Sequence, residues 1–182
     1  SSLRGHHGQR PGPRGFVRGL FITPGDLARY PAPKQVEAPP HQLAVLGETK
    51  AGRVLHATSA TVKHWADMRR AAQQDGIHLE VLSAFRSIDY QRQLIARKLN
   101  RGDPPNQILQ VVALPGYSEH HTGRALDIVT IDYPELTEDF ELSDGFAWLS
   151  HSAHQFGFSL SYPRDNPWGF IYEPWHWCFN PA

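Results

Sequence analysis

The apolar positions that follow Ser59 lie three or four residues apart, which is the spacing of one face of an α-helix. They are Val62, Trp65, Met68 and Ala72. The pattern predicts a helix that is capped by Ser59 and ends at Gly76, where a glycine can adopt the left-handed conformation of a helix stop.

Further elements are predicted from the same patterns. Ile77, Leu79 and Val81 alternate with other residues, which is typical of a strand. The remaining predicted helices are 87–99, 107–113 and 144–155. The remaining predicted strands are 125–129, 158–161 and 171–179. Because helices and strands are mixed without a regular βαβ order, we expect an α+β domain with a small, mainly antiparallel sheet flanked by helices.

The N-terminal segment, residues 1–42, differs from the rest of the chain. It is rich in proline, glycine and basic residues and contains one short apolar patch. Such a segment buries too little apolar surface to fold alone, so it is either flexible or packed on the domain that follows. The sequence therefore predicts an irregular arm over residues 1–42 and a catalytic domain over residues 43–182.

Composition excludes several classes of protein. The chain has 182 residues, 18 basic and 18 acidic side chains, and one cysteine. This length suits one domain with an appendage, and one cysteine allows no internal disulfide. A net charge of zero gives no basic face for nucleic acid, and no apolar run is long enough to span a membrane. The eleven histidines point instead to metal binding or to acid–base chemistry.

Two segments concentrate residue types that bind metals, Ser118–Asp127 and Glu173–Trp177. A catalytic zinc site uses three protein ligands, commonly histidine and carboxylate, and leaves a fourth position open. His120, Asp127 and His176 can supply such a set. Glu173 lies three residues before His176 and can take a proton from an attacking water. Spacing alone leaves open that these histidines are packed core residues instead.

Three motifs in order resemble those of the VanY-type zinc D-Ala-D-Ala carboxypeptidases. They are the Ser-x-His-x-x-Gly-x-Ala-x-Asp pattern of 118–127, the Glu-Pro-Trp-His-Trp run of 173–177, and the Ser-Ala-Phe-Arg-Ser block of 83–87. The resemblance covers Leu43 to Phe179. It extends to a wider group that includes lysostaphin-type peptidases and the hedgehog signalling domain, and it implies their α+β fold.

The resemblance also implies roles for individual residues. His120, Asp127 and His176 match the ligands of one zinc ion, and Glu173 matches the general base. Arg86 matches an arginine that contacts the substrate and that can also steady the oxyanion. Substrate-binding positions of the family are matched by Ser118 and Gln91.

The implied function is hydrolysis of the C-terminal D-alanine from peptidoglycan stem peptides or muropeptides. Two other activities on the same fold stay open, an L,D-carboxypeptidase and a peptidoglycan endopeptidase or lysin. A zinc-stabilised binding module without catalysis is the alternative of another class, although the presence of Glu173 speaks against it. Residues 1–15 lack the apolar core of a signal peptide, so an extracytoplasmic place in the cell envelope is implied by the resemblance alone.

Several histidines and the cysteine require a separate interpretation. His121 replaces the usual glutamine of the family, and we expect it to be exposed or to support a ligand rather than bind metal. His151 and His154 are expected on a solvated helix face. Cys178 stands where the family has arginine and is expected to be a buried thiol with a packing role.

Overall fold

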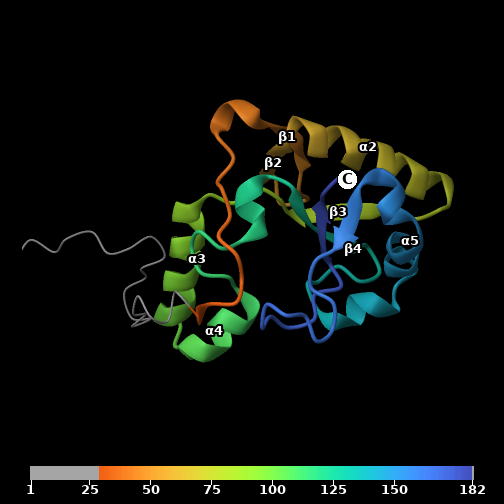
Figure 1. Ribbon diagram of the computed structural model, residues 1–182. Helices are drawn as coiled ribbons and strands as arrows, with labels where there is room; N and C mark the ends of the chain where they lie inside the picture. Colours follow the sequence, from red (N-terminus) through yellow and green to blue (C-terminus); the bar gives the residue numbers. More distant parts are fainter. Residues whose placement is uncertain (1–28, 182) are drawn as a thin grey trace, which may run out of the picture.

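The structure is a computed structural model that describes residues 29–181. Over this range it contains four α-helices and two antiparallel sheets (Figure 1). The strands are β1 (Leu43–Glu48), β2 (Val54–Thr58), β3 (Leu79–Ser83), β4 (Ala125–Thr130), β5 (Phe158–Leu160) and β6 (His176–Phe179). The α-helices are α2 (Ser59–Gln74), α3 (Ile88–Asn100), α4 (Pro105–Val111) and α5 (Asp144–Ser152). Short 3-10 helices are η1 (Pro40–Gln42), η2 (Glu119–Thr122), η3 (Glu138–Leu142) and η4 (Ala153–Phe156).

The larger sheet has the strand order β3-β4-β6-β5, and every pairing in it is antiparallel. This confirms the predicted α+β class with a small antiparallel sheet. In the β4–β6 pair, Asp127 lies opposite His176 and Leu126 lies opposite Trp177. Because opposed residues of neighbouring strands share a face, the first pair points to one side of the sheet and the second to the other.

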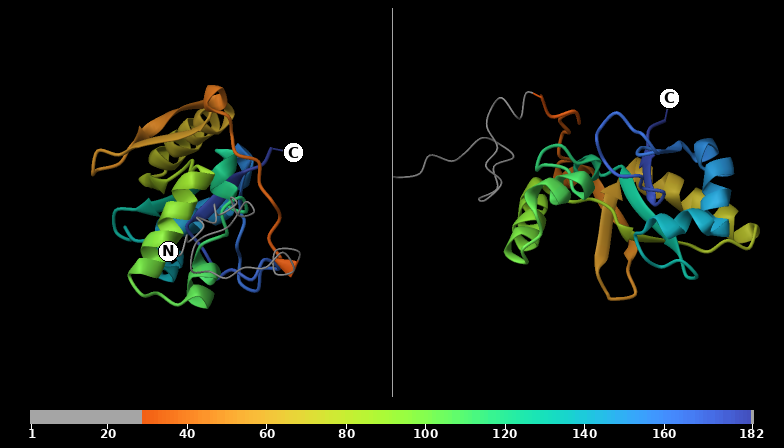
Figure 2. Two further views of the ribbon diagram at one scale, coloured as in Figure 1. Left: turned by 90° about the vertical axis from the view of Figure 1, so that its left-hand side faces the viewer. Right: turned by 90° about the horizontal axis from the view of Figure 1, so that it is seen from below.

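Apolar side chains form two separate buried clusters. The larger one packs α2 and α5 against the sheet and includes Met68, Leu126 and Trp177. The smaller one joins α3 to α4 and includes Ile95 and Ile108. Figures 1 and 2 show α3 and α4 together on one side of the sheet and α2 and α5 on the other. The surface between the two clusters is where β4 and β6 present Asp127 and His176.

A two-stranded hairpin, β1–β2, was not among the predicted elements. Its alternating pattern is obscured because Val45 and Val54 are exposed, and because the register shifts between Val45 and Gly47. The hairpin contacts the loop after β3 and the end of η2. The Phe85 N–H donates to His56 O at 2.8 Å, and the Thr58 N–H donates to Gly123 O at 2.9 Å.

The predicted strand 171–179 is wrong over its first half, because β6 begins only at His176. Pro174 has no N–H to give to a sheet, and the His176 N–H donates to Glu173 O at 3.2 Å, which closes a turn. Glu173 therefore lies in a turn outside β6.

The other predicted boundaries hold to within a few residues. The cap of α2 is Thr58 rather than Ser59, since the Thr58 hydroxyl accepts from the Thr61 N–H. The predicted helix 144–155 is an α-helix that tightens into η4, and Gly157 ends it with a left-handed φ of 83°. No helix among the described residues has the length and apolar character needed to cross a bilayer.

The end of the N-terminal arm, residues 30–42, packs on the domain that follows, whereas residues 1–28 lie outside the described residues. The Gln35 N–H donates to Gly116 O and the Ala38 N–H donates to His121 O, both at 2.8 Å. The Glu37 carboxylate accepts from the Ile88 N–H at 2.6 Å. The arm thus holds the segment before η2 and the first turn of α3.

Candidate metal centre and substrate cavity

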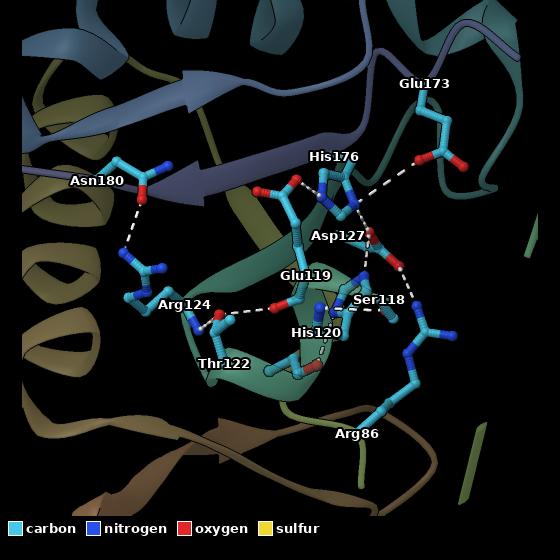
Figure 3. A network of polar contacts seen from close by, with 11 residues as sticks. Arg86, Ser118, Glu119, His120, Thr122, Arg124, Asp127, Glu173, His176 and Asn180 are labelled. Carbon is cyan, nitrogen blue, oxygen red and sulfur yellow. Dashed lines mark hydrogen bonds and ion pairs between the residues drawn. The ribbon is translucent and has the colours of Figure 1, made fainter. Parts of the chain in front are cut away.

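Three side chains of the kinds that bind metals converge on one point. Asp127 comes from β4, His176 from β6 and His120 from η2 (Figure 3). Asp127 Oδ1 is 3.1 Å from His120 Nε2 and 3.3 Å from His176 Nδ1. One ligand atom from each of the three residues lies within 4.8 Å of the others, and all three side chains are buried. Among the described residues no other group of this kind is present.

The short helix η2 and the turn that follows it bring His120 next to β4. The Ser118 hydroxyl accepts from the His120 N–H and begins η2. Gly123 ends η2 with a left-handed φ of 70°, and a Cβ at this position would lie about 3.1 Å from side-chain atoms of Leu43 and Thr58. Glycine is therefore required here for both conformation and space. The turn returns the chain into β4 with His120 beside Asp127.

The hydrogen bonds of the two histidines determine which ring nitrogens face Asp127. His120 Nδ1 is 2.7 Å from Ala84 O, and a carbonyl oxygen only accepts, so Nδ1 carries the hydrogen. In the neutral ring, Nε2 then directs its lone pair at Asp127 Oδ1. A lone pair and a carboxylate oxygen that face each other at 3.1 Å repel unless a cation lies between them. The donor set therefore fits a metal ion such as zinc.

Glu119 orients the second histidine, a role that the residue pattern did not predict. Its Oε1 is 3.2 Å from His176 Nε2, so the ring can donate from Nε2 and present Nδ1 to Asp127. A carboxylate that accepts from the outer nitrogen of a histidine ligand is a common support of metal sites. The signal in the sequence was its position directly beside His120 in the motif.

Glu173 lies next to the three candidate ligands. The turn that precedes β6 places Glu173 Oε2 3.7 Å from His176 Nδ1. The residue is 8% exposed, and burial raises the pKa of its carboxyl group to about 7. Glu173 is therefore a buried carboxylate at the wall of the candidate centre, in reach of the same space as Asp127.

The charged groups of the centre shift one another's pKa values. Burial lowers the pKa of His120. For Asp127, burial raises the pKa but His120 and His176 outweigh it, so the carboxyl stays ionised. For His176, burial lowers the pKa but the hydrogen bonds to Asp127 and Glu119 raise it above its ordinary value. Asp127 and Glu119 thus stabilise a positive charge on the ring of His176.

Arg86 stands on the other side of Asp127. Its Nη2 is 3.9 Å from Asp127 Oδ2, and its Nη1 donates to Gln91 Oε1 at 3.4 Å. Its Nε is buried and has no hydrogen-bond partner among the described residues. Gln91 also donates to Ala113 O at 2.9 Å, so both ends of its amide are engaged. Arg86 is thus held in place, and its buried Nε–H is left without a partner among the described residues.

His121 is fully buried, so of the two expectations for it exposure is wrong and a supporting role remains. Its Nδ1 donates to Arg86 O at 2.7 Å, and its Nε2 accepts from the Gly116 N–H at 3.1 Å. Both ring nitrogens are occupied, so His121 braces the backbone of Arg86 and cannot replace His120 as a ligand. Cys178 is buried as expected, and His151 and His154 are exposed as expected.

The candidate centre opens into a cavity of about 360 Å³. The seven residues with a predicted role all line it, namely Arg86, Gln91, Ser118, His120, Asp127, Glu173 and His176. Trp175 lines it too. Tyr162 is a further lining residue without a predicted role, and its ring lies 4.5 Å from that of His176 between centroids. Burial raises the pKa of the Tyr162 hydroxyl, so it stays a donor.

The chain is similar to several known proteins over much of its length. The Bacillus subtilis protein YodJ is 32% identical over 115 residues, which cover 58% of this chain and 40% of YodJ. The LD-carboxypeptidase LdcB, whose structure addresses peptidoglycan recognition, superposes with a TM-score of 0.71 at 27% identity, over 82% of this chain and 74% of LdcB.

A second solved structure is a variant of the vancomycin-resistance D,D-pentapeptidase VanY from the VanB-type cassette, in complex with Zn(II). It has a TM-score of 0.58 at 26% identity and covers 82% of each chain. The chain spans about two fifths of the length of three curated relatives that it matches. The family model for VanY, described as D-alanyl-D-alanine carboxypeptidase, matches residues 55–182. With more than half of its length matched, including all three motifs, this chain belongs to the VanY D-alanyl-D-alanine carboxypeptidase family.

Proposed function

We propose that the protein is a zinc-dependent D,D-carboxypeptidase that removes the C-terminal D-alanine from peptidoglycan stem peptides. The observation that carries this proposal is the convergence of His120, Asp127 and His176 with Glu173 and Arg86 in one cavity. Solved relatives include VanYB in complex with D-alanine-D-alanine. Because this substrate is part of the cell wall, we further propose that the protein acts outside the cytoplasm.

The metal set would be His120 Nε2, His176 Nδ1 and a carboxylate oxygen of Asp127. A zinc ion bound there would act as a Lewis acid on the scissile carbonyl and would acidify a water molecule. The hydrogen bonds from His120 to Ala84 O and from His176 to Glu119 hold both rings before the metal arrives. The site is therefore organised for binding rather than assembled by it.

Glu173 would move the proton. Its buried carboxylate accepts a proton from the attacking water and then gives it to the amine that leaves as D-alanine. Two features support this role, its place in the cavity wall and its distance of 3.7 Å from His176. The turn before β6 takes Glu173 out of the strand that carries His176. Glu173 therefore lies beside the proposed metal ligands without being one of them.

Arg86, Ser118 and Gln91 would bind and position the peptide. The free Nε of Arg86 and its Nη groups can hold a carboxylate or the oxyanion that forms on the carbonyl. Ser118 accepts from the His120 N–H, which leaves its own hydroxyl hydrogen for the substrate. Gln91 acts mainly through Arg86, since its oxygen accepts from that side chain.

A second candidate is release of D-alanine from a tetrapeptide, the L,D-carboxypeptidase reaction. The observation in its favour is the TM-score of 0.71 with the LD-carboxypeptidase LdcB. The two reactions share the same chemistry and differ in the length of peptide that the cavity accepts.

Digestion of muropeptides with three, four and five stem residues tests both activities. We expect the zinc-loaded protein to convert the pentapeptide to the tetrapeptide with release of D-alanine, as followed by mass spectrometry. Conversion of the tetrapeptide to the tripeptide alone would favour the second candidate. No D-alanine from any of them, with zinc bound in a one-to-one ratio, would contradict the proposed function.

We also propose that residues 43–182 form the catalytic domain and that residues 30–42 brace it. The bonds from Gln35, Glu37 and Ala38 hold the loops that carry Arg86 and His120. A chain that begins at residue 43 should therefore lose most of its activity, and its melting temperature should fall by several degrees, relative to a chain that begins at residue 29. Equal activity and stability of the two chains would refute a bracing role.

A further inference from the structure

Arg86 lies in a loop, residues 84–87, between the end of β3 and the start of α3. The contacts of its guanidinium group are long: Nη1 is 3.4 Å from Gln91 Oε1, and Nη2 is 3.9 Å from Asp127 Oδ2 (Figure 3). Well-formed hydrogen bonds from N–H groups measure about 2.7–3.2 Å. The side-chain contacts alone therefore do not fix where the guanidinium lies, and its place depends on the backbone that carries it.

The backbone of Arg86 is held by two consecutive residues of η2. The Arg86 N–H donates to His120 O at 3.1 Å, and the Arg86 carbonyl accepts from His121 Nδ1 at 2.7 Å. His120 is also the candidate ligand whose Nε2 faces Asp127. The peptide groups on both sides of the Arg86 Cα are thus tied to the short helix that carries a candidate ligand, and this relates the place of Arg86 to the metal centre.

The His121 ring that holds the Arg86 carbonyl is itself fixed. It is fully buried, and its Nε2 accepts from the Gly116 N–H at 3.1 Å. The N-terminal arm binds the same two residues from outside, since the Gln35 N–H donates to Gly116 O and the Ala38 N–H donates to His121 O, both at 2.8 Å. Both edges of the ring are therefore bonded, and a buried group that loses its partner destabilises the fold.

His121 does not line the main cavity, whereas Arg86 and His120 do. The ring can therefore act on a bound peptide only through the residues that it holds. Arg86 is the one of them whose side-chain contacts are long, so its guanidinium depends most on the backbone bond. A shift of about 1 Å in a group that positions a substrate can lower the rate about 10²-fold.

We propose that His121 is a positioning residue, which sets the place of Arg86 relative to the metal centre and so determines how well the peptide is held for cleavage. This inference rests on the proposed function, since it takes Arg86 to bind the peptide. The bond from Nδ1 to the Arg86 carbonyl carries the effect, and the bond from Gly116 fixes the ring that makes it. His121 differs in this from Glu119, which supports the candidate ligand His176.

His121→Leu tests this role, because leucine has a similar volume and forms neither hydrogen bond. We expect kcat/KM for release of D-alanine from a stem pentapeptide to fall about 10²-fold. Zinc affinity should fall by less than about tenfold, the smallest loss expected for a residue that supports a metal ligand. His121→Gln should recover most of the activity, because its amide offers a donor and an acceptor. Activity of His121→Leu that excess zinc restores would overturn the inference.

A double-mutant cycle with Arg86→Gln separates a role through Arg86 from a general loss of packing. If His121 acts through the guanidinium, His121→Leu should have little further effect on kcat/KM once Arg86 is replaced, so the two losses are far from additive. Fold-changes that multiply in the double variant would show that His121 acts by another route, and the inference would be wrong.

Ser143→Ala is the matched control for stability. Ser143 is buried, begins α5 by accepting from the Phe146 N–H at 2.9 Å, and does not line the cavity. Loss of this cap should lower the melting temperature, as should His121→Leu, but it should leave kcat/KM unchanged. An equal fall in kcat/KM in both variants would mean that general loosening of the fold explains the effect, against the inference.

Two further arms keep the inference separate from the function beneath it. If His121→Leu does not fold, His121→Asn replaces it in the cycle, since the shorter amide corresponds to the Nδ1 position alone. No release of D-alanine by the unaltered zinc-loaded protein would overturn the proposed function. Calorimetric titration of D-alanyl-D-alanine into the zinc-loaded Glu173→Gln variant then decides the inference: added His121→Leu should weaken binding when Arg86 is present and leave it unchanged after Arg86→Gln. Equal weakening in both backgrounds would refute it.

Discussion

Replacing Glu173 by glutamine is expected to lower kcat for D-alanine release about 10³-fold or more while zinc stays bound. The carboxylate is 8% exposed and lies 3.7 Å from His176 Nδ1, at the wall of the cavity. Glutamine has nearly the same shape but cannot accept a proton, so the attacking water and the leaving amine lose their proton carrier. General acid–base groups contribute about 10²–10⁴-fold to rates. The measurement is D-alanine release, together with zinc content by elemental analysis.

Glu135→Gln is the control for this experiment. Glu135 is exposed in the loop after β4 and takes part in neither the cavity nor the candidate centre. It should retain full activity. If Glu173→Gln keeps more than about a tenth of the activity of the unaltered protein, another group must carry the proton, and the role given to Glu173 is wrong.

Replacing Asp127 by asparagine is expected to abolish both metal binding and activity. Asp127 Oδ1 is the atom that both histidines face, at 3.1 and 3.3 Å. The amide removes the negative charge that offsets a divalent cation, and it leaves Arg86 without its acidic neighbour. Loss of a supporting residue alone reduces metal affinity about 10–100-fold. Loss of a charged ligand should therefore reduce the affinity more than about 100-fold. Competition with a chromogenic chelator measures this affinity.

Glu119→Gln removes the charge of a residue that supports a ligand, for comparison with the loss of the ligand Asp127 itself. Glu119 orients His176 from outside the ligand set, and its pKa lies near 2, where hydrogen bonding to His176 overcomes the opposing effect of burial. The amide oxygen can still accept from His176 but without charge, so we expect a decrease of about 10–100-fold in zinc affinity, with activity restored by excess zinc. Equal affinities of the Glu119 and Asp127 variants would contradict the division into ligand and support. Circular dichroism of both variants checks that the fold is intact.

Several features of the fold follow directly from residue patterns. The three- and four-residue spacing of Val62, Trp65, Met68 and Ala72 predicted α2, and the alternation around Leu79 predicted β3. Both elements are confirmed: Trp65, Met68 and Ala72 belong to the buried face of α2, and Leu79 is buried at the start of β3. The β1–β2 hairpin escaped prediction because exposed valines and a register shift remove that regularity. The start of β6 was misplaced because Pro174 and the turn to His176 depend on hydrogen bonds that apolar spacing does not encode.

The candidate site was likewise predicted in part from the sequence and in part not. The motifs named seven residues, and the structure brings all seven to one cavity, whereas their individual roles stay predictions until the variants are measured. Three other features came from contacts between segments distant in sequence. These are the support of His176 by Glu119, the Tyr162 ring against His176, and the clamp of His121 on the Arg86 backbone.

Residue identities and their order along the chain were enough to establish the family, the α+β class and the candidate ligands His120, Asp127 and His176. Chemistry at that level depends on which side chains are present and on their spacing. Which nitrogen of each histidine faces Asp127, and which donor of Arg86 is left without a partner, became visible only in the folded chain. Each of these depends on distances between atoms that the fold brings together from α3, η2, β4 and β6, and such distances have no counterpart in a linear sequence.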